Sequence, residues 1–414
     1  MSAVGASGGE GAPSGGEGVP SGGEGAPSGG EGARSGAEAP LELTIVAHDV
    51  GPVRGMERQL TDLILGLRER GHSVSVIGRS CELPAGSGVA FHRVRGPGRP
   101  FVLAYPWFLL AGSIAVMRAR RGIVQATGAI VLNRVDAVAV HYVHSVATNT
   151  PSRPTLLYRL HDRAARVLKR LGERLCYRPG RARAFVCVSE GAAEEMRRAF
   201  PAIASRVVTI YNGVDTEGFA PGLRREQAAA LRAELGLAEE RLVAAFVGSE
   251  WERKGLAELI AALALAPEWA LVVAGGGDEQ AYRELAARAG VGDSVRFLGV
   301  TSEVGRVYDM ADAFVLPSSY ETFSLVTFEA AASGLPVLAT PVNGVRELIE
   351  DGRNGILIGR DPDSIAAALR RLGADPGLRA ELGAAARRSA LAFGRERMVA
   401  EHEALYERLV AERY

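Results

Sequence analysis

Residues 318–336, SSYETFSLVTFEAAASGLP, decide the fold of the second half of this chain. The preceding residues 311–317, ADAFVLP, form an apolar run that ends in proline, which is typical of a buried parallel strand. The alanine-rich part of the stretch predicts a helix, which Gly334 and Pro336 end before the strand PVLAT. The stretch is therefore a strand, loop, helix and strand unit.

Two carboxylates, Glu321 and Glu329, lie seven residues apart within this unit. In open parallel sheets the loops at the carboxyl ends of strands carry the ligand, and the first N–H groups of the following helix have no partner of their own. Such a place binds an anionic group best, most often phosphate, whereas carboxylates suit hydroxyl groups. If the intervening residues were all helical, the two glutamates would lie roughly 12 Å apart along the axis.

The length of 414 residues suggests two domains, because single cores stop growing at roughly 250 to 300 residues. Lysine plus arginine and aspartate plus glutamate balance at 48 each, so no global charge indicates nucleic acid as a partner. The three cysteines lack metal-ligand spacing and fit a reducing cytosol. Because the start of the chain has no basic and apolar signal sequence, we expect a cytoplasmic protein.

Residues 1–40 repeat a seven-residue unit close to SGGEGAP. Glycine, serine, proline and glutamate without an apolar period cannot bury enough surface to offset the cost of ordering. We expect a disordered acidic tail, either dispensable or acting as a tether.

The first domain, expected over residues 41–217, opens with a strand (41–50), a loop flanked by Gly51 and Gly55, an amphipathic helix and a second strand (73–77). This is a βαβ unit with a glycine loop. The glycines either permit the turn or let a substrate approach the backbone, and their spacing is not GxGxxG.

Residues 101–117, FVLAYPWFLLAGSIAVM, are the most apolar stretch of the chain. Their length is at the short limit for a membrane span and Pro106 lies inside, so we expect a buried or interfacial helix instead. The later strand 136–142 places His141 and His144 near its carboxyl end. Two histidines at a strand end beside a cleft are either structural or functional.

Residues 153–183 are rich in arginine with interleaved leucines, which predicts an amphipathic helix with a cationic face. That face is either solvated or in contact with anionic lipid headgroups or an anionic acceptor. Residues 184–190 then predict a strand that ends near Ser189, a helix cap.

The second domain, expected over residues 218–394, shows a fresh alternation of strands and helices, and residues 395–414 are helical. Three of its loops follow strands: Arg253 and Lys254 in one, residues 275–277 with Gly276 at their centre in the next, and the stretch with both glutamates in a third. All three should emerge at the same edge of the sheet and converge on one ligand. The two cations can make charge-assisted bonds to a diphosphate, and free N–H groups around Thr322, Phe323, Ser324 and Leu325 can add more.

Other chemistries have no support in the sequence, which contains no HExxH or GxxxxGK[ST] motif and matches GxSxG only at residues 5–9, GASGG, in the repeat tail. The DPD at residues 361–363 formally matches a metal-binding DxD, but we expect it to cap a helix. We therefore expect no metal and no cofactor.

Glu321, Glu329 and the residues between them resemble the E-x7-E signature of retaining nucleotide-sugar glycosyltransferases of family 4. Further motifs follow in family order over residues 41–414, namely the loop before GMERQL, YNGVD, FVGSEWERKG, VVAGGGD, VRFLG and NGVRELIEDGRNGILI. The resemblance implies an α/β fold of the GT-B type, with two Rossmann-like domains facing across a cleft and a C-terminal helix (395–414) that packs back on the first domain.

The resemblance also implies roles for the site residues. Glu321 would bind hydroxyls of the donor sugar and Glu329 the ribose, while Arg253 and Lys254 would neutralise the departing diphosphate. Gly51 and Gly55 would line the cleft, and His141 would lie near the reacting sugar, with His144 as the alternative. Retention in the family is ascribed to front-face attack assisted by the leaving phosphate, so no dedicated nucleophile is expected.

Three positions depart from the family pattern. Ser249 follows Gly248 where many members have arginine, Ser324 replaces the last glycine of the usual EGFG, and Asn343 stands where glycine is common. The serine at 324 matters most, because glycine lets the backbone approach the ligand.

The sequence thus predicts a retaining glycosyltransferase that moves a sugar from a nucleotide diphosphate sugar to a sugar, lipid-linked or small-molecule acceptor, such as a cell-envelope glycolipid or polysaccharide precursor. Local basicity suggests peripheral contact with an anionic membrane at its inner face. The alternatives are a nucleotide-sugar epimerase on the same fold and a non-catalytic protein that binds a sugar nucleotide or a membrane surface.

Overall fold

A computed structural model describes residues 39–52, 55–146 and 156–412 of the chain. The chain divides into two units, residues 1–39 and 40–414. Except for its last two residues, the repeat tail expected over residues 1–40 lies outside the described residues.

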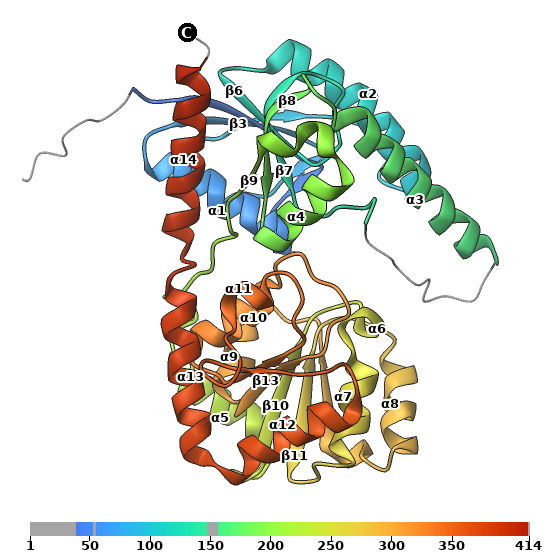
Figure 1. Cartoon of the computed structure of the whole chain (residues 1–414), viewed down its shortest axis with the longest axis vertical. Helices are drawn as coiled ribbons and strands as arrows, with labels where there is room; N and C mark the ends of the chain where they lie inside the picture. The colour runs from blue at the N-terminus through green and yellow to red at the C-terminus, as the bar shows by residue number, and fades with distance from the viewer. Residues whose placement is uncertain (1–38, 53–54, 147–155, 413–414) are drawn as a thin grey trace, which may run out of the picture. The chain divides into compact units, whose positions relative to one another are not determined.

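The first domain is built on a sheet of seven parallel strands (Figure 1). Leu43 of the interior strand β1 pairs with Val74 on one side and Ile123 on the other, and apolar residues make these strands buried on both faces. The spatial order is β5 (Ala90–Arg93), β3 (Ser73–Gly78), β1 (Glu42–Val46), β6 (Ile123–Thr127), β7 (Val135–Val140), β8 (Ala182–Cys187) and β9 (Val207–Thr209). A separate parallel pair joins β2 (Asp49–Val50) to β4 (Ser80–Cys81).

Helices cover both faces of this sheet. One face packs against α2 (Phe101–Ala119), α3 (Leu156–Cys176) and α4 (Glu190–Ala199), and the other against α1 (Gly55–Glu69) and α14 (Arg395–Ala411). A short 3-10 helix, η1 (Pro201–Arg206), leads from α4 to β9. Ser189 caps α4 as expected, its side chain accepting a hydrogen bond from the Ala192 N–H at 3.1 Å.

The second domain has a sheet of six parallel strands, ordered β12 (Val295–Gly299), β11 (Trp269–Ala274), β10 (Leu242–Val247), β13 (Ala313–Leu316), β14 (Val337–Ala339) and β15 (Ile356–Leu357). Its helices are α5 (Arg225–Glu234), α6 (Trp251–Lys254), α7 (Leu256–Leu263), α8 (Glu279–Arg288), η2 (Gly292–Ser294), α9 (Val304–Asp309), α10 (Leu325–Ala332), α11 (Val345–Leu348), α12 (Pro362–Ala374) and α13 (Pro376–Leu391). Two parallel sheets with helices on their faces confirm the predicted α/β architecture. Asp361 of the DPD motif caps α12, its carboxylate accepting a hydrogen bond from the Ser364 N–H at 2.8 Å.

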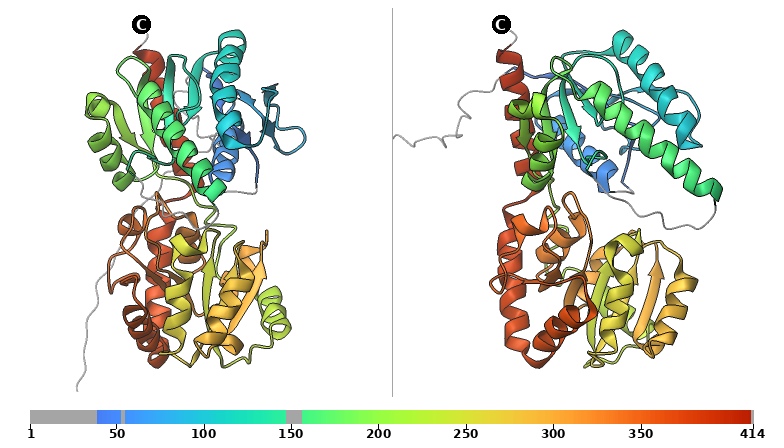
Figure 2. Two further views of the ribbon diagram at one scale, coloured as in Figure 1. Left: turned by 90° about the vertical axis from the view of Figure 1, so that its right-hand side faces the viewer. Right: turned by 45° about the vertical axis from the view of Figure 1, so that its right-hand side comes forward.

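The last helix, α14, returns to the first domain (Figure 2). Met398, Val399 and Tyr406 lie in the same core as α1 and β1. The contact is close, since a Cβ on Gly66 of α1 would lie only 2.5 Å from Val399. The Tyr406 hydroxyl also donates to Oε1 of Gln125 on β6 at 2.9 Å.

Three segments differ from the sequence-based expectation. The basic helix α3 ends at Cys176, so Arg178, Arg181 and Arg183 do not extend it, and Arg183 lies on β8. Residues 251–254, expected as a loop, form the single helical turn α6. Helix α2 forms with Pro106 inside it, but only one of its sides is buried, so it is not the fully buried alternative of the prediction.

Candidate active site

The centre of the site is a buried charge cluster between α6 and the loop after β13. Nζ of Lys254 donates to Oε1 of Glu321 at 2.8 Å, and the same oxygen lies 3.1 Å from Nη1 of Arg253. The hydroxyl of Ser318 donates to it at 2.9 Å. Only 7% of Lys254 and 8% of Glu321 is exposed. Burial alone would raise the pKa of Glu321, but Lys254 and Arg253 outweigh it and hold that pKa below its usual range.

Gly248, at the carboxyl end of β10, leaves room for the side chain of Lys254 to reach Glu321. Its φ of +141° belongs to backbone that L residues rarely adopt, and a Cβ there would lie 2.6 Å from Cε of Lys254. The indole N–H of Trp251 donates to the Gly248 carbonyl at 2.9 Å and fixes the start of α6. The turn is therefore shaped so that the lysine stem lies directly on the backbone of residue 248.

The glycine loop after β11 packs against the same turn. A Cβ on Gly275 would approach the Gly248 carbonyl oxygen to 2.2 Å, and one on Gly276 would lie 3.8 Å from Oγ of Ser249. Together with the pair between Lys254 and Glu321, these contacts show that the three predicted loops meet at one edge of the second sheet.

Ser324, the departure from the family pattern, keeps a left-handed backbone with φ +67°. It is the N-cap of α10, yet its side chain caps no backbone N–H; its hydroxyl instead lies 2.7 Å from that of Thr327. The backbone geometry that glycine would supply is thus retained by a serine. Phe323 stacks on Phe328, and the Thr322 carbonyl accepts a hydrogen bond from the Ser189 hydroxyl of the first domain at 2.6 Å.

Glu329 lies one helical turn into α10 and is 2% exposed. The hydroxyl of Tyr308 donates to its Oε2 at 3.1 Å, and its Oε1 forms an ion pair with Arg58 of α1. Because α10 begins at Leu325, residues 321–324 are not helical, and the 12 Å estimate for a continuous helix does not apply.

Gly51 and Gly55 of the first domain flank residues 53–54, which lie outside the described residues. Gly55 begins α1, and a Cβ there would lie 3.3 Å from Cδ1 of Leu325. The start of α1 therefore faces the start of α10. Gly51 instead lies beside Glu82 of its own domain, whose Cβ would be 3.4 Å from a Cβ at residue 51.

A cavity of about 170 Å³ opens at the carboxyl ends of β6 and β7, beneath α2 and α3. Its lining includes both predicted histidines and a set of residues that the sequence did not single out, among them His48, Tyr105, Thr127, Tyr142, Lys169 and Glu173. Three of its polar atoms are enclosed and have no hydrogen-bond partner within the described part of the chain: Nδ1 of His48, Oγ1 of Thr127 and Nε2 of His141. Such atoms are costly to bury, and they suit a ligand with hydroxyl groups.

Burial disfavours the charged form of the three histidines that line this cavity. Burial lowers the pKa of His48 to about 4, and Arg79 adds to the shift. Burial also lowers the pKa of His141 to about 4, with a contribution from His402. The pKa of His144 is lowered by burial to about 3. The His144 ring contacts that of Tyr142 in a tilted arrangement, with centroids 4.6 Å apart, and the His144 backbone N–H donates to Glu173 at 2.6 Å.

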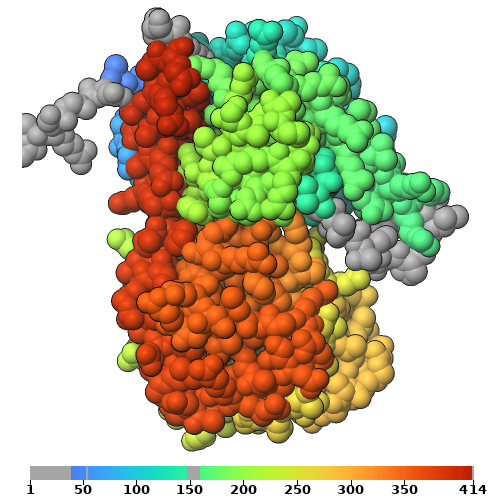
Figure 3. All heavy atoms as spheres, viewed as in Figure 1, coloured from blue at the N-terminus to red at the C-terminus, as the bar shows by residue number. Residues whose placement is uncertain are grey.

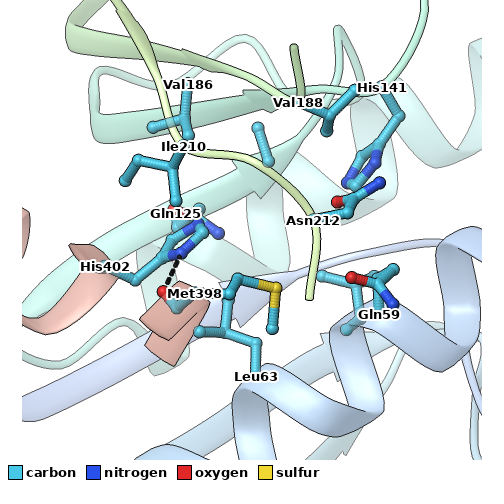
Figure 4. A pocket seen from close by; sticks show the side chains of 12 residues that line it. Gln59, Leu63, Gln125, His141, Val186, Val188, Ile210, Asn212, Met398 and His402 are labelled. Carbon is cyan, nitrogen blue, oxygen red and sulfur yellow. Dashed lines mark hydrogen bonds between the residues drawn. The ribbon is translucent and has the colours of Figure 1, made fainter. Parts of the chain in front are cut away.

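His141 also lines a smaller cavity of about 20 Å³ formed with α1 and α14 (Figure 4). Asn212, Gln125 and His402 are among its other lining residues. Nδ1 of His402 lies 2.9 Å from the Met398 carbonyl oxygen. His141 thus stands between the larger cavity and the contact with the C-terminal helix. No spacing pattern in the sequence linked these four residues.

Within the described residues, no three or more His, Cys, Asp or Glu side chains are grouped so that they could hold a metal ion.

Several curated relatives of this chain are glycosyltransferases. This chain is 29% identical over 364 residues to an uncharacterized glycosyltransferase, MJ1607, of Methanocaldococcus jannaschii, and the match covers 82% of this chain and 90% of that protein. It is 39% identical over 226 residues to a D-inositol 3-phosphate glycosyltransferase of Salinispora arenicola. That match covers half of each chain, so this chain spans about half the length of that relative.

Solved structures share the fold. WaaG, a glycosyltransferase involved in lipopolysaccharide biosynthesis, superposes with a TM-score of 0.73 at 20% identity over 87% of this chain and 98% of that one. Anabaena HepE in complex with UDP-glucose superposes with a TM-score of 0.66, also at 20% identity, over 90% and 100% of the two chains.

Two family descriptions match the two halves of the chain: Glycosyltransferase Family 4 over residues 53–218 and Glycosyl transferases group 1 over residues 227–389. The predicted family is confirmed by these matches, by the curated relatives and by the shared fold. The chain belongs to the GT-B glycosyltransferases.

Proposed function

We propose that this glycosyltransferase is a retaining enzyme that moves a sugar from a nucleotide diphosphate sugar, held by the second domain, to an acceptor hydroxyl in the 170 Å³ cavity of the first. The observation that carries the proposal is the buried cluster of Lys254, Arg253 and Glu321 at the sheet edge where α10 begins. Lys254 and Arg253 place positive charge beside the N–H groups of a helix start, with the buried Glu321 and the exposed Glu250 as their partners.

That charge suits the diphosphate of the donor. Lys254 and Arg253 would stabilise the charge that develops on the leaving diphosphate, so their effect falls on rate as well as on binding. The recorded bonds of Glu321 all run to Oε1, and its carboxylate would accept hydrogen bonds from hydroxyls of the donor sugar. The HepE complex with UDP-glucose supports a donor of this class. We propose that these side chains stabilise the leaving diphosphate without a metal ion.

Glu329 would bind the ribose hydroxyls of the donor. Arg58 now forms an ion pair with one of its oxygens. Ribose would therefore share that carboxylate with Arg58 or take its place, which makes Arg58 a neighbour of the bound nucleoside.

The transfer itself needs no protein nucleophile. The bond from the anomeric carbon to the diphosphate oxygen breaks, the acceptor oxygen bonds to the same face of that carbon, and the acceptor proton passes to the leaving phosphate oxygen. Neutral His141 would accept or donate a hydrogen bond to the reacting sugar through Nε2, which has no partner in the described chain. His144 would serve the acceptor side of the same cavity.

We propose a cell-envelope glycolipid or polysaccharide precursor as the acceptor, and action in the cytoplasm at the inner face of the membrane. WaaG, which shares the fold, is involved in lipopolysaccharide biosynthesis, and this supports an acceptor of that kind. The aromatic lining that Phe101 and Tyr105 of α2 give the cavity supports it as well.

A panel of nucleotide sugars tests the proposal. Incubation of the purified chain with each donor should yield slow release of nucleoside diphosphate and free sugar from one of them. Glu321→Ala should abolish that release without changing the unfolding midpoint. Added acceptor should give a product with the anomeric configuration of the donor, measured by NMR.

Two outcomes would contradict the proposal. An epimerised nucleotide sugar formed without nucleotide release would indicate an epimerase. Donor binding without any turnover, across the panel and with acceptor extracts, would indicate a binding protein.

A further inference from the structure

Helix α2 exposes a stripe of large apolar side chains along its outer side. Their exposed fractions are far above those of core residues, at 61% for Leu103, 51% for Trp107, 61% for Leu110, 45% for Ile114 and 66% for Met117. The spacing of four, three, four and three residues places all five on one helical side. An exposed apolar stripe of this length is uncommon on a soluble domain and marks an interaction surface.

The opposite side of α2 is part of the protein core. Tyr105, Phe108 and Val116 are buried against the first sheet. In the described part of the chain, α2 is the helix that is long and apolar enough to cross a membrane. A helix with one side fixed in a protein core cannot be surrounded by lipid, so its exposed side is suited to lying on a surface.

Helix α3 lies beside α2 on the same face of the sheet (Figures 1 and 2). Gly172 makes the approach possible, because a Cβ there would overlap the hydroxyl of Tyr105. Leu160, Val167 and Leu171 of α3 are 55%, 59% and 49% exposed. Since both helices bury one side against the same sheet face, their other sides point outward together.

Basic side chains accompany this apolar surface. Arg163, Arg170 and Arg174 are exposed between the apolar residues of α3. Further exposed arginines stand at the two ends of α2, namely Arg95, Arg99, Arg118, Arg120 and Arg121. The sequence of α2 itself contains no acidic residue. Apolar side chains with arginines beside them match the two layers of an anionic bilayer surface, acyl chains and phosphate headgroups.

We propose that these outer sides, called here the α2–α3 face, dock the enzyme on a bilayer that contains anionic phospholipid. The apolar residues of both helices enter the boundary between headgroups and acyl chains, and the arginines contact the lipid phosphates. Figure 3 shows α3 running along the surface of the first domain, with its outer side open to solvent.

The face also determines where the acceptor comes from, an inference that rests on the proposed function. The inner sides of the same two helices line the 170 Å³ cavity through Phe101, Tyr105, Lys169 and Glu173. The ammonium group of Lys169 lies 5.0 Å from the centre of the Phe101 ring. A bilayer on the outer side would therefore bring a lipid-linked acceptor to the same two helices that line the cavity.

Vesicle co-sedimentation of the full chain tests the docking. The vesicles are phosphatidylcholine alone and phosphatidylcholine with roughly a third phosphatidylglycerol. Wild type should bind the anionic vesicles, and binding should fall as salt rises. Leu110→Asp combined with Met117→Asp should weaken binding about tenfold or more, because two apolar contacts are lost and two negative charges are gained.

The arginines are tested separately. Arg163→Gln, Arg170→Gln and Arg174→Gln together should weaken binding about a hundredfold, at about fivefold for each arginine. Leu223→Asp is the matched control, since Leu223 is 58% exposed but lies in the connection to the second domain; it should bind like wild type.

Three results would overturn the proposal. The first is equal binding to both vesicle types, and the second is unchanged binding by the aspartate variant. The third is that wild type binds no vesicles but forms a dimer, which Leu110→Asp dissociates. The last would assign the face to a second copy of the chain. Release of nucleotide from soluble donor should be unchanged in all these variants. Loss of vesicle binding with intact release contradicts only the docking, whereas vesicle binding without release in wild type contradicts only the enzymatic function.

Discussion

Replacing Gly248 by alanine should remove Lys254 from the active site without touching the lysine itself. The new Cβ would lie 2.6 Å from Cε and 2.7 Å from Cδ of Lys254, so the stem has to move and the ammonium group leaves Glu321. Alanine at φ +141° costs about 1–3 kcal/mol. Partial loss of the buried ion pair between Lys254 and Glu321 adds to this cost. Arg253, 3.1 Å from Glu321, still neutralises the carboxylate, so we expect the free energy of unfolding to fall by about 2–4 kcal/mol in total.

The expected effect on activity is larger than that on folding. Loss of one preorganised cation at the leaving group should lower kcat about a hundredfold. Donor turnover is measured by released nucleotide, and stability by urea unfolding. Gly236→Ala is the matched control, because Gly236 also has a left-handed backbone, with φ +64°, but nothing within 4 Å of a Cβ. It should lose about 1–2 kcal/mol and keep full turnover. Full turnover in Gly248→Ala would refute the role given to Lys254.

Two further predictions concern the interface between the domains. Ser324→Gly should keep the free energy of unfolding within about 1 kcal/mol of wild type and preserve turnover, because relief of backbone strain at φ +67° offsets the lost hydrogen bond to Thr327. Ser324→Val should lose more than about 2 kcal/mol of stability and most of the activity. Equal behaviour of the two variants in unfolding and turnover assays would contradict this prediction. Burial raises the pKa of Asp62 to about 6, against the opposing effects of Arg395 and Arg58. Its ionisation therefore opposes folding as pH rises from about 4 to 6, and Asp62→Asn should be about 2–3 kcal/mol more stable than wild type at pH 8 and equal to it near pH 3.5. Urea unfolding at both pH values checks this, and a pH-independent difference would show that the carboxylate charge is not responsible.

Much of the second domain was predictable because its ligand loops are local in sequence. Strand ends followed by glycine, arginine with lysine, or a hydroxyl-rich turn each carry their own signal, and the parallel sheet brings them together. Glu321 and Lys254 were singled out in this way, but not their direct ion pair, which depends on the path that Gly248 opens. The conformation of Ser324 could not be predicted either, because serine rarely adopts a left-handed backbone.

The first-domain cavity was mostly beyond sequence reasoning. His141 and His144 were found from their place at a strand end, but His48 lies in the turn after β1, Thr127 on β6 and Lys169 on α3, and no spacing links them. Likewise, the composition of residues 101–117 showed an apolar helix but not which of its sides the sheet would leave exposed. The ion pair of Arg58 with Glu329 joins residues of the two domains that are 271 positions apart in the sequence, so no local pattern indicates it.

The central claim is that Lys254 and Arg253 hold the diphosphate of a donor at the edge of the second sheet. Calorimetric titration of nucleoside diphosphate into wild type and Lys254→Ala tests it most directly, with Arg288→Ala as control, a cation on α8 whose side chain is 67% exposed. We predict about tenfold or greater loss of affinity in Lys254→Ala, with loss of donor turnover, and no change in the control. Unchanged nucleotide affinity and unchanged turnover in Lys254→Ala would contradict the claim.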